Sequence, residues 1–241
     1  MTWFASWFDS PYYHILYRHR DDSDAGVFIS SLLDHLNLSK GSTIIDLGCG
    51  KGRHARIIAQ QGYHVIGLDL SPESINHCNS LQIPNAEFHV HDMRNPFPAS
   101  EVDAVFNLFT SFGYFDTDQE HQEVISNAAG ALKTGGILVI DYLNSFQVES
   151  NLIAREQLLI DQIEFNIQRF KSSGRFIKQI EFSDRGANFR FEEKVAALCL
   201  DDFKRYLSNA GFQLEGVYGN YELHPFDEKV SSRLIIIARK K

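Results

Sequence analysis

Three glycines at alternate positions, preceded by an aspartate, form the stretch of this sequence best suited to hold a ligand. Asp46 stands two residues before Gly48, and Gly50 and Gly52 follow. Glycine tolerates a positive φ and carries no Cβ, so this backbone can approach a ligand closely. Asp69 lies about twenty residues further on, where an acid can accept both hydroxyls of a ribose. The turn and the acid together predict a site for a ribose-containing cofactor.

The residues around the turn have the pattern of an α/β unit. Residues 43–47 are apolar and rich in β-branched side chains, which predicts a strand, and apolar residues recur at helical spacing in residues 53–61. Gly62 is a typical helix stop. Residues 64–69 predict a second strand that ends in the acid. The predicted helix begins at the turn and points unpaired N–H groups at the same place.

Two common glycine motifs do not fit this turn. The dinucleotide fingerprint needs a glycine where this chain has Arg53. The phosphate-binding P-loop needs serine or threonine after its lysine, but Lys51 is followed by Gly52. What remains, Asp-x-Gly-x-Gly-x-Gly, resembles the first motif of the class I S-adenosylmethionine (SAM) methyltransferases. The resemblance implies SAM as the cofactor and S-adenosylhomocysteine (SAH) as its product.

Later segments carry the same resemblance, whose motifs run in order over residues 40–145. Asp92 and Met93 follow a predicted strand at residues 86–90, at the place where the family holds the adenine amino group. An aspartate that only caps a turn is the alternative for Asp92. Leu-Lys-x-Gly-Gly then precedes an apolar strand at residues 137–142. The resemblance implies a set of cofactor-binding residues: Asp46, Gly48, Cys49, Gly50, Gly52, Asp69, Leu70, Asp92, Met93, Asn107 and Leu108.

The loop after the fourth predicted strand bears on the kind of acceptor. Asn107 is followed by Leu108 and Phe109, whereas nucleic-acid amino-methyltransferases carry Asp/Asn-Pro-Pro-Tyr/Phe, so that subclass is disfavoured. Residues 111–115, Ser-Phe-Gly-Tyr-Phe, resemble the loop of SAM enzymes that act on small molecules. Their rings are expected either to pack around the methyl sulfonium or to belong to the core. The resemblance implies a small-molecule acceptor, methylated at nitrogen or oxygen by in-line displacement.

No catalytic base is assigned from the sequence. No Ser/His/Asp relay and no metal-binding cluster stand out, so we expect no metal, and a base is required only if the acceptor is protonated. His121 lies in a predicted helix at residues 119–133 and is expected to face solvent. The acceptor-side candidates, for each of which a purely structural role is the alternative, are Tyr17, Tyr114, Tyr142 and His224.

Charge and composition narrow the partners. The formal net charge of −8 argues against non-specific nucleic-acid binding, with Arg18, His19 and Arg20 as one candidate basic patch. No apolar run is long enough to cross a bilayer, and the N-terminus lacks the features of a signal peptide. The three scattered cysteines fit reduced thiols. We expect a cytoplasmic protein, monomeric or homodimeric, that binds neither nucleic acid nor membrane.

The whole chain, residues 1–241, predicts one domain. We expect a Rossmann-like doubly wound α/β sheet of seven strands whose last strand is antiparallel, formed by residues 41–150 and 200–241. Residues 151–199 alternate with period two, which predicts an inserted antiparallel β layer, either over the active site or as a decorative or dimerising sheet. Residues 1–40 resemble a helical lid. Either its tyrosines close over the cofactor or they are core and docking residues.

Two other functions remain open at this point. An NAD-dependent oxidoreductase would share the glycine turn and Asp69, but Arg53 breaks its fingerprint and the chain has no Tyr-x-x-x-Lys pair. A catalytically inactive SAM-binding protein would keep the cofactor motifs and lack an accessible acceptor pocket.

Overall fold

The computed structural model describes residues 3–18 and 22–241. His19 and Arg20 of the candidate basic patch lie outside these ranges, and Arg18 pairs with Asp161 at 2.5 Å. The described elements follow one another in this order: α1 (Trp3–Phe8), α2 (Pro11–Leu16), α3 (Asp22–Leu36), β1 (Thr43–Leu47), α4 (Arg53–Gln60), β2 (His64–Asp69), α5 (Pro72–Ser80), β3 (Ala86–Val90), β4 (Val102–Asn107), α6 (Asp118–Ala131), β5 (Leu132–Leu143), α7 (Ser145–Ser150), β6 (Arg155–Ile160), β7 (Ile163–Ser172), β8 (Arg175–Asp184), β9 (Ala187–Ala196), α8 (Leu200–Asn209), β10 (Phe212–Tyr218) and β11 (Arg233–Lys240).

The larger sheet has seven strands in the order β10-β11-β5-β4-β1-β2-β3. Neighbouring strands from β3 to β5 pair in parallel, whereas β11 pairs antiparallel with both β5 and β10. The predicted doubly wound sheet with an antiparallel last strand is therefore confirmed. The strand order reverses beside β1, and open α/β sheets bind their ligands at the carboxyl ends of the strands near such a reversal.

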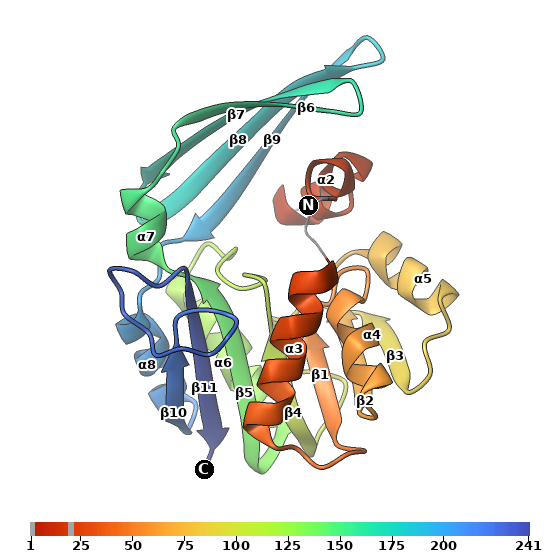
Figure 1. The fold of residues 1–241 in the computed structure, drawn as a ribbon, viewed down its shortest axis with the longest axis vertical. Coiled ribbons are helices and arrows are strands. Elements are labelled where there is room, and N and C mark those ends of the chain that lie inside the picture. Colours follow the sequence, from red (N-terminus) through yellow and green to blue (C-terminus); the bar gives the residue numbers. More distant parts are fainter. Residues whose placement is uncertain (1–2, 19–21) are drawn as a thin grey trace.

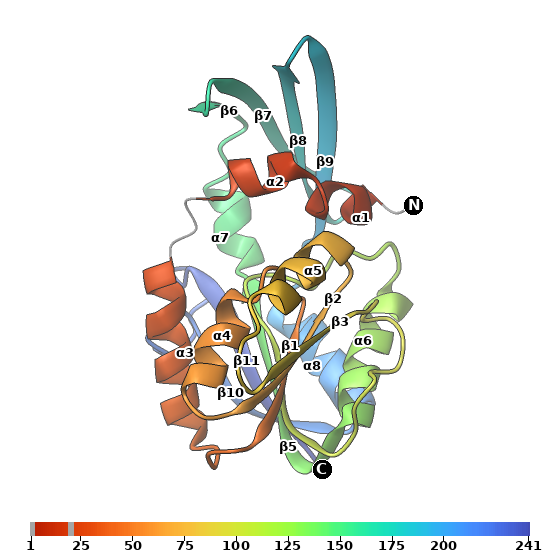
Figure 2. The same cartoon turned by 90° about the vertical axis from the view of Figure 1, so that its right-hand side faces the viewer.

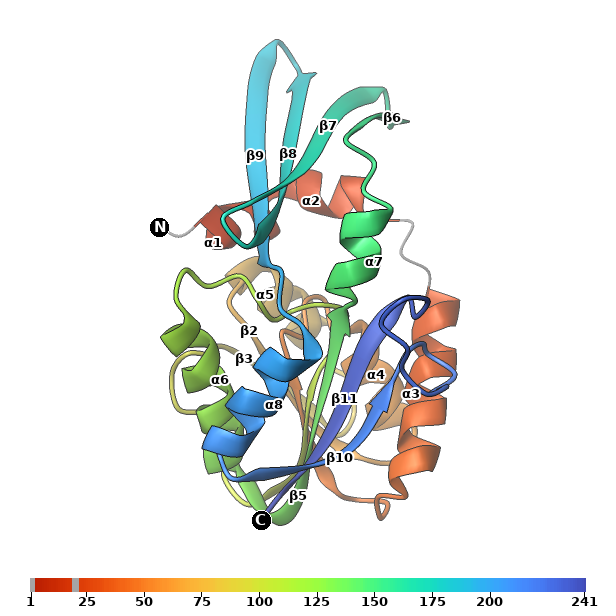
Figure 3. The ribbon, with the colours of Figure 1, turned by 90° about the vertical axis from the view of Figure 1, so that its left-hand side faces the viewer.

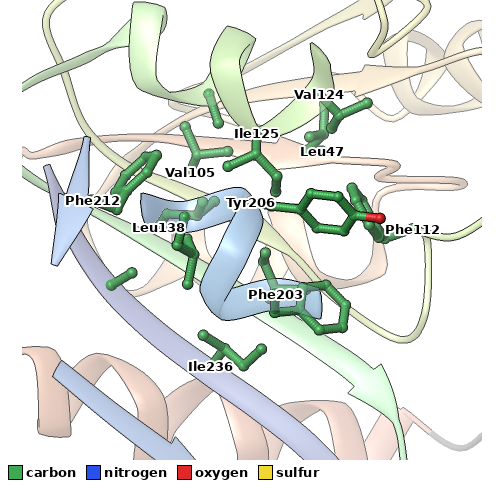
Figure 4. Packing of buried hydrophobic residues seen from close by; sticks show 14 of the residues in the cluster. Leu47, Val105, Phe112, Val124, Ile125, Leu138, Phe203, Tyr206, Phe212 and Ile236 are labelled. Carbon is green, nitrogen blue, oxygen red and sulfur yellow. The ribbon is translucent and has the colours of Figure 1, made fainter. Parts of the chain in front are cut away.

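Helices cover both faces of this sheet (Figures 2 and 3). On one face, α3, α4 and α5 bury apolar side chains such as Phe28 and Ile58 against the strands. On the other face, α6 and α8 do the same, and Figure 4 shows Phe203 and Tyr206 of α8 packed beside Phe112. None of the helices in the described ranges is both long and apolar enough to span a membrane.

The second sheet, β6-β7-β8-β9, is antiparallel throughout and stands beyond the carboxyl edge of the first (Figure 1). The short helices α1 and α2 lie between the two sheets. Trp7 and Leu16 of these helices are buried against Phe165 and Phe182 of the second sheet. The alternation of residues 151–199 thus gives the second sheet an apolar face, which packs on the N-terminal helices. The antiparallel sheet predicted from this period of two is therefore confirmed.

One expectation about α6 is wrong. His121 was expected to face solvent, but only 3% of it is exposed. Its ring lies 5.2 Å from that of Phe112 and 5.5 Å from that of Phe115, measured between centroids. The helical pattern located the helix, yet the aromatic loop before it covers the histidine. Burial lowers the pKa of His121, which favours the neutral ring.

Candidate functional site

The glycine turn joins β1 to α4, and its shape requires glycine. Gly48 and Gly52 have φ of 78° and 75°, in the left-handed region. A Cβ on Gly48 would lie 2.6 Å from the Cβ of Ser111, and one on Gly52 would lie 2.9 Å from the Sγ of Cys78. Two of the three glycines are therefore fixed by close packing inside the protein.

Gly50 differs, because a Cβ on it would meet nothing within 4 Å. Its N–H donates to Oδ2 of Asp69 at 2.8 Å, and the N–H of Ser71 donates to Oδ1 at 2.9 Å. These bonds fix the orientation of the carboxylate, which still has lone pairs to accept from a ligand. Burial raises the pKa of Asp69. The Gly50 backbone and the Asp69 carboxylate thus form a preorganised surface at the end of β2.

Asp46 lies beneath the turn and not in the cavity. Only 1% of it is exposed, and its Oδ2 has no hydrogen-bond partner among the described residues. Burial, together with the nearby Asp69, raises the pKa of Asp46 to about 7, although the N–H of Ala55 and the charge of Arg53 oppose the shift. Asp46 can therefore affect a bound ligand only through the glycine turn that separates it from the cavity.

A continuous cavity of about 1110 Å³ extends from the glycine turn to the N-terminal helices. It brings together most of the predicted cofactor-binding residues, and those that line it are Gly48, Cys49, Gly50, Asp69, Leu70, Asp92, Met93 and Leu108. Asp46, Gly52 and Asn107 are behind its wall. Asn107 is 2% exposed and its Nδ2 donates to the carbonyl of Leu47 at 2.9 Å, so it joins the ends of β4 and β1.

Asp92 lines the cavity and is already paired. Arg94 contacts its carboxylate through Nη2 at 2.6 Å and extends Nη1 to Glu120 at 2.7 Å. The hydrogen bond from Arg94 lowers the pKa of Asp92. The backbone N–H of Arg94 also donates to Asp92 at 3.0 Å, which is the turn-capping geometry considered as the alternative. Both roles are compatible, because a carboxylate has about four lone-pair sites.

The loop after β4 has a backbone conformation that is unusual for its residue types. Phe109 and Thr110 both have positive φ, at 57° and 63°. The N–H of Phe109 donates to the buried carboxylate of Asp141 at 2.9 Å, and Arg233 bonds both Asp141, at 2.7 Å, and the hydroxyl of Thr110, at 2.9 Å. These contacts hold a conformation that costs about 1–2 kcal/mol per residue, so the loop is fixed in place.

The N-terminal helices complete the cavity from the opposite side. Phe4, Phe8 and Tyr17 line it. The Tyr17 hydroxyl lies 2.7 and 2.8 Å from the two carboxylate oxygens of Glu193 on β9, and Lys178 on β8 donates to the same hydroxyl at 2.5 Å. Residues of the second sheet therefore orient a side chain that faces the cavity.

The four acceptor-side candidates fall into two groups. Tyr17 and Tyr114 line the cavity, and the hydroxyl of Tyr114 donates to the carbonyl of Thr110. Tyr142 is fully buried and donates to the carbonyl of Ala196 at 2.6 Å, where burial raises its pKa well above the usual value. His224 is exposed, outside the cavity lining, in the loop that follows β10, and its ring bonds Asn220.

Several residues that line the cavity, or that contact its lining, were not singled out from the sequence. Ser111 belongs to the Ser-Phe-Gly-Tyr-Phe loop, so the motif that drew attention to its aromatic neighbours could also have indicated this serine. Nothing in the sequence indicated a role for Glu193 or Lys178, because polar residues at alternate positions of a strand are common. In the described ranges, no group of three or more histidine, cysteine, aspartate or glutamate side chains is arranged to hold a metal ion.

Comparison with known proteins gives consistent results. Residues 38–177 match the methyltransferase domain family. The dTDP-3-amino-3,4,6-trideoxy-α-D-glucopyranose N,N-dimethyltransferase of Streptomyces venezuelae is 23% identical over 189 residues, which cover 75% of this chain and 79% of that protein. A SAM-dependent methyltransferase from Clostridium acetobutylicum has a TM-score of 0.80 at 17% identity, with 95% and 96% of the two chains covered. The SAM-bound amino pentose methyltransferase of Micromonospora echinaspora has a TM-score of 0.69 at 19% identity, with 96% and 98% covered.

Proposed function

The chain belongs to the methyltransferase domain family and is a SAM-dependent methyltransferase, and we propose that it methylates a nitrogen or oxygen atom of a small-molecule acceptor. The observation that carries this proposal is the continuous cavity bounded by the glycine turn on one side and by the aromatic N-terminal helices on the other. Such a cavity has room for a cofactor and a small acceptor together, and the relative from Streptomyces venezuelae is named for an amino-sugar acceptor.

The residues of the turn fit SAM. We assign the open space at Gly50 to the methionine part of the cofactor and the carboxylate of Asp69 to the ribose hydroxyls, with Asp92 and Met93 at the adenine. Leu108 would border the amino-acid end. The residues behind the wall would act through the backbone: Asp46, Gly52 and Asn107 keep the turn and the ends of β1 and β4 in position.

When bound, SAM supplies a methyl group made electrophilic by the adjacent sulfonium. The work left to the protein is to align the acceptor with that methyl group and to exclude water. Tyr17 and Tyr114 face the cavity from the lid and from the loop after β4, so we assign them to the acceptor. Tyr17, already bonded to Glu193 and Lys178, can accept a proton from a protonated acceptor as it releases its own to Glu193.

The same proposal covers the organisation of the chain. Residues 1–40 act as a lid, residues 41–150 and 200–241 as the SAM-binding core, and residues 151–199 as a roof that fixes the lid. Because the net charge is −8, we expect a small molecule and not a nucleic acid as partner. We also propose that the protein is cytoplasmic and that it is a monomer or a homodimer.

Calorimetry followed by an acceptor screen tests the proposal. SAM and SAH should bind the purified protein and NAD should not. Amino sugars, nucleotide-linked amino sugars, other amines and phenols would then be incubated with SAM, and SAH formation measured. A supporting result is turnover with one amine or hydroxyl class that is lost in Asp69→Ala. Binding of SAM with no SAH formed from any class would instead favour an inactive SAM-binding protein.

A further inference from the structure

Two buried thiols lie under the glycine turn. Cys49 is the second residue of the turn and Cys78 lies on α5, with 5% and 0% of each exposed, and neither is in a disulfide. The carbonyl oxygen of Gly50 accepts from both, from Cys78 at 3.4 Å and from Cys49 at 3.7 Å. One oxygen thus holds together two sulfurs that come from separate elements.

The two sulfurs share one enclosure. A Cβ on Gly52 would lie 2.9 Å from the Sγ of Cys78, and a Cβ on Gly67 would lie 3.0 Å from the Sγ of Cys49. The ring of Phe88 borders both of these positions. The hydrogen bond from Cys49 lowers the pKa of Cys78, which favours the thiolate, the form of cysteine that reacts.

We propose that Cys49 and Cys78 form an oxidative modification site, a dithiol that closes to a disulfide and thereby weakens cofactor binding. The inference rests on the proposed place of SAM at the glycine turn. Cys49 lines the cavity and the carbonyl that joins the thiols belongs to Gly50, the residue whose N–H holds Asp69. Oxidation of the two thiols should therefore change the positions of Gly50 and Asp69, which we assign to cofactor binding.

Hydrogen peroxide is a sufficient oxidant. One sulfur attacks a peroxide oxygen, the O–O bond breaks, and hydroxide leaves and is protonated to water, which gives a sulfenic acid. The second sulfur attacks the sulfenic sulfur, an S–S bond forms, the S–O bond breaks, and the oxygen leaves as a second water with the remaining thiol proton. Two thiols lose two electrons, and one peroxide is reduced to two waters.

The disulfide has two structural consequences. It removes both S–H donors from the Gly50 carbonyl, and it draws α5 towards the turn, because an S–S bond is much shorter than a non-bonded contact between sulfurs. Since the Gly50 N–H donates to Asp69, a displaced peptide at this residue disturbs the carboxylate as well. Bound SAM covers the turn and should in turn slow the oxidation.

The experiment uses the full chain carrying Cys199→Ser, which removes the exposed thiol at the N-cap of α8. Protein with and without SAH is treated with hydrogen peroxide, and intact mass and peptide mapping are recorded. We expect a loss of two hydrogens, a peptide that joins Cys49 to Cys78, and slower formation when SAH is present. SAH should bind the oxidised protein at least about tenfold more weakly, and thiol reductant should restore it.

Cys78→Ser is the matched control, with Cys78→Ala as a second variant if the first folds poorly. Either should keep its SAH affinity through the peroxide treatment. The proposal is overturned if no Cys49–Cys78 peptide forms, or if it forms and SAH affinity does not change. Failure of the reduced protein to bind SAH would count against the proposed cofactor site, and the mass measurement separates that result from failure of the thiol pair to react.

Discussion

The hydroxyl of Tyr17 and the carboxylate of Glu193, 176 positions apart in the chain, lie within 2.7 Å of each other. The same carboxylate accepts the indole N–H of Trp7 at 2.7 Å. Glu193 belongs to β9 of the inserted sheet, so the insertion helps to fix where the N-terminal helices lie, together with contacts from the α/β core such as that of Phe4 with Phe115. This arrangement gives the first prediction.

Glu193→Ala should loosen the N-terminal helices while the core stays folded. The indole of Trp7 is fully buried and would lose its acceptor, which costs about 1–3 kcal/mol. We expect faster tryptic cleavage at Arg18, which is exposed, together with weaker SAH binding. Cleavage is followed by mass spectrometry and binding by calorimetry.

Glu192→Ala is the matched control, because Glu192 neighbours Glu193 on β9 but bonds Lys194 and Gln179 instead of the helices. It should leave cleavage at Arg18 unchanged. Equal cleavage rates in the two variants would mean that Glu193 does not hold the helices.

Gly50→Ala should separate folding from cofactor binding. Its added methyl meets nothing within 4 Å, so the stability loss should come from the positive φ alone, about 1–2 kcal/mol. Gly135→Ala is the control, since Gly135 also has positive φ and open space around it, at the start of β5. Urea unfolding should give similar losses for both variants, while SAH affinity should fall only in Gly50→Ala. A Gly50→Ala protein with normal SAH affinity would place the cofactor elsewhere.

Gly48→Ala should be the more damaging glycine substitution. Its φ of 78° is close to the 77° of Gly135, but its Cβ would lie 2.6 Å from the Cβ of Ser111. The difference in unfolding free energy between Gly48→Ala and Gly135→Ala therefore measures the steric clash alone. We expect about 1–3 kcal/mol, as for overpacked cores. Urea unfolding measures it. Gly48→Ala in combination with Ser111→Gly should recover part of the loss, and no recovery would show that the clash is not with Ser111.

Asp69→Ala should weaken SAM and SAH binding at least tenfold. The variant removes an acceptor proposed to bond two ribose hydroxyls, and hydrogen bonds to a charged group contribute about 1.5–3 kcal/mol each. Asp201→Ala, an exposed acid that pairs with Lys204 on α8, is the control and should bind normally. Calorimetry with both ligands measures the effect. Full affinity in Asp69→Ala would remove this residue from the proposed site.

Local patterns were sufficient for the strands, for the glycine turn and for the inserted sheet. The insertion was predicted because alternation with period two puts Ile163, Phe165 and Ile167 on one face, and that face is the one that packs on the N-terminal helices. The turn was predicted from glycines at alternate positions, and in the structure Gly48 and Gly52 stand where a Cβ would come too close to its neighbours.

What the sequence could not indicate depends on contacts between distant residues. Nothing near Glu193 or Lys178 in the chain signals that they meet Tyr17, because each looks like the polar side of an ordinary strand. Tyr142 has the chemistry of an acceptor-side residue, yet its hydroxyl is buried against the end of β9. Residue type and approximate position were predictable, but the side chain's direction was decided by packing.

The pH dependence of stability should report on Asp46. Its pKa in the folded protein is raised to about 7, mainly by burial, from an unfolded value of about 3.9. Between these values the folded state holds a proton that the unfolded state has released, so the contribution of Asp46 to stability falls as pH rises from about 4 to about 7 and is constant above that. Three pKa steps correspond to at most about 4 kcal/mol.

Asp46→Asn removes this dependence, because the amide does not titrate. We expect the variant to gain stability relative to the wild type between pH 4.5 and pH 8, by about 2–4 kcal/mol in urea unfolding without ligand. Asp69 faces the same region and also has a raised pKa, so the difference between variant and wild type, not the absolute curve, is the quantity to compare. A difference that is flat over this range would show that Asp46 stays ionised in the folded protein throughout.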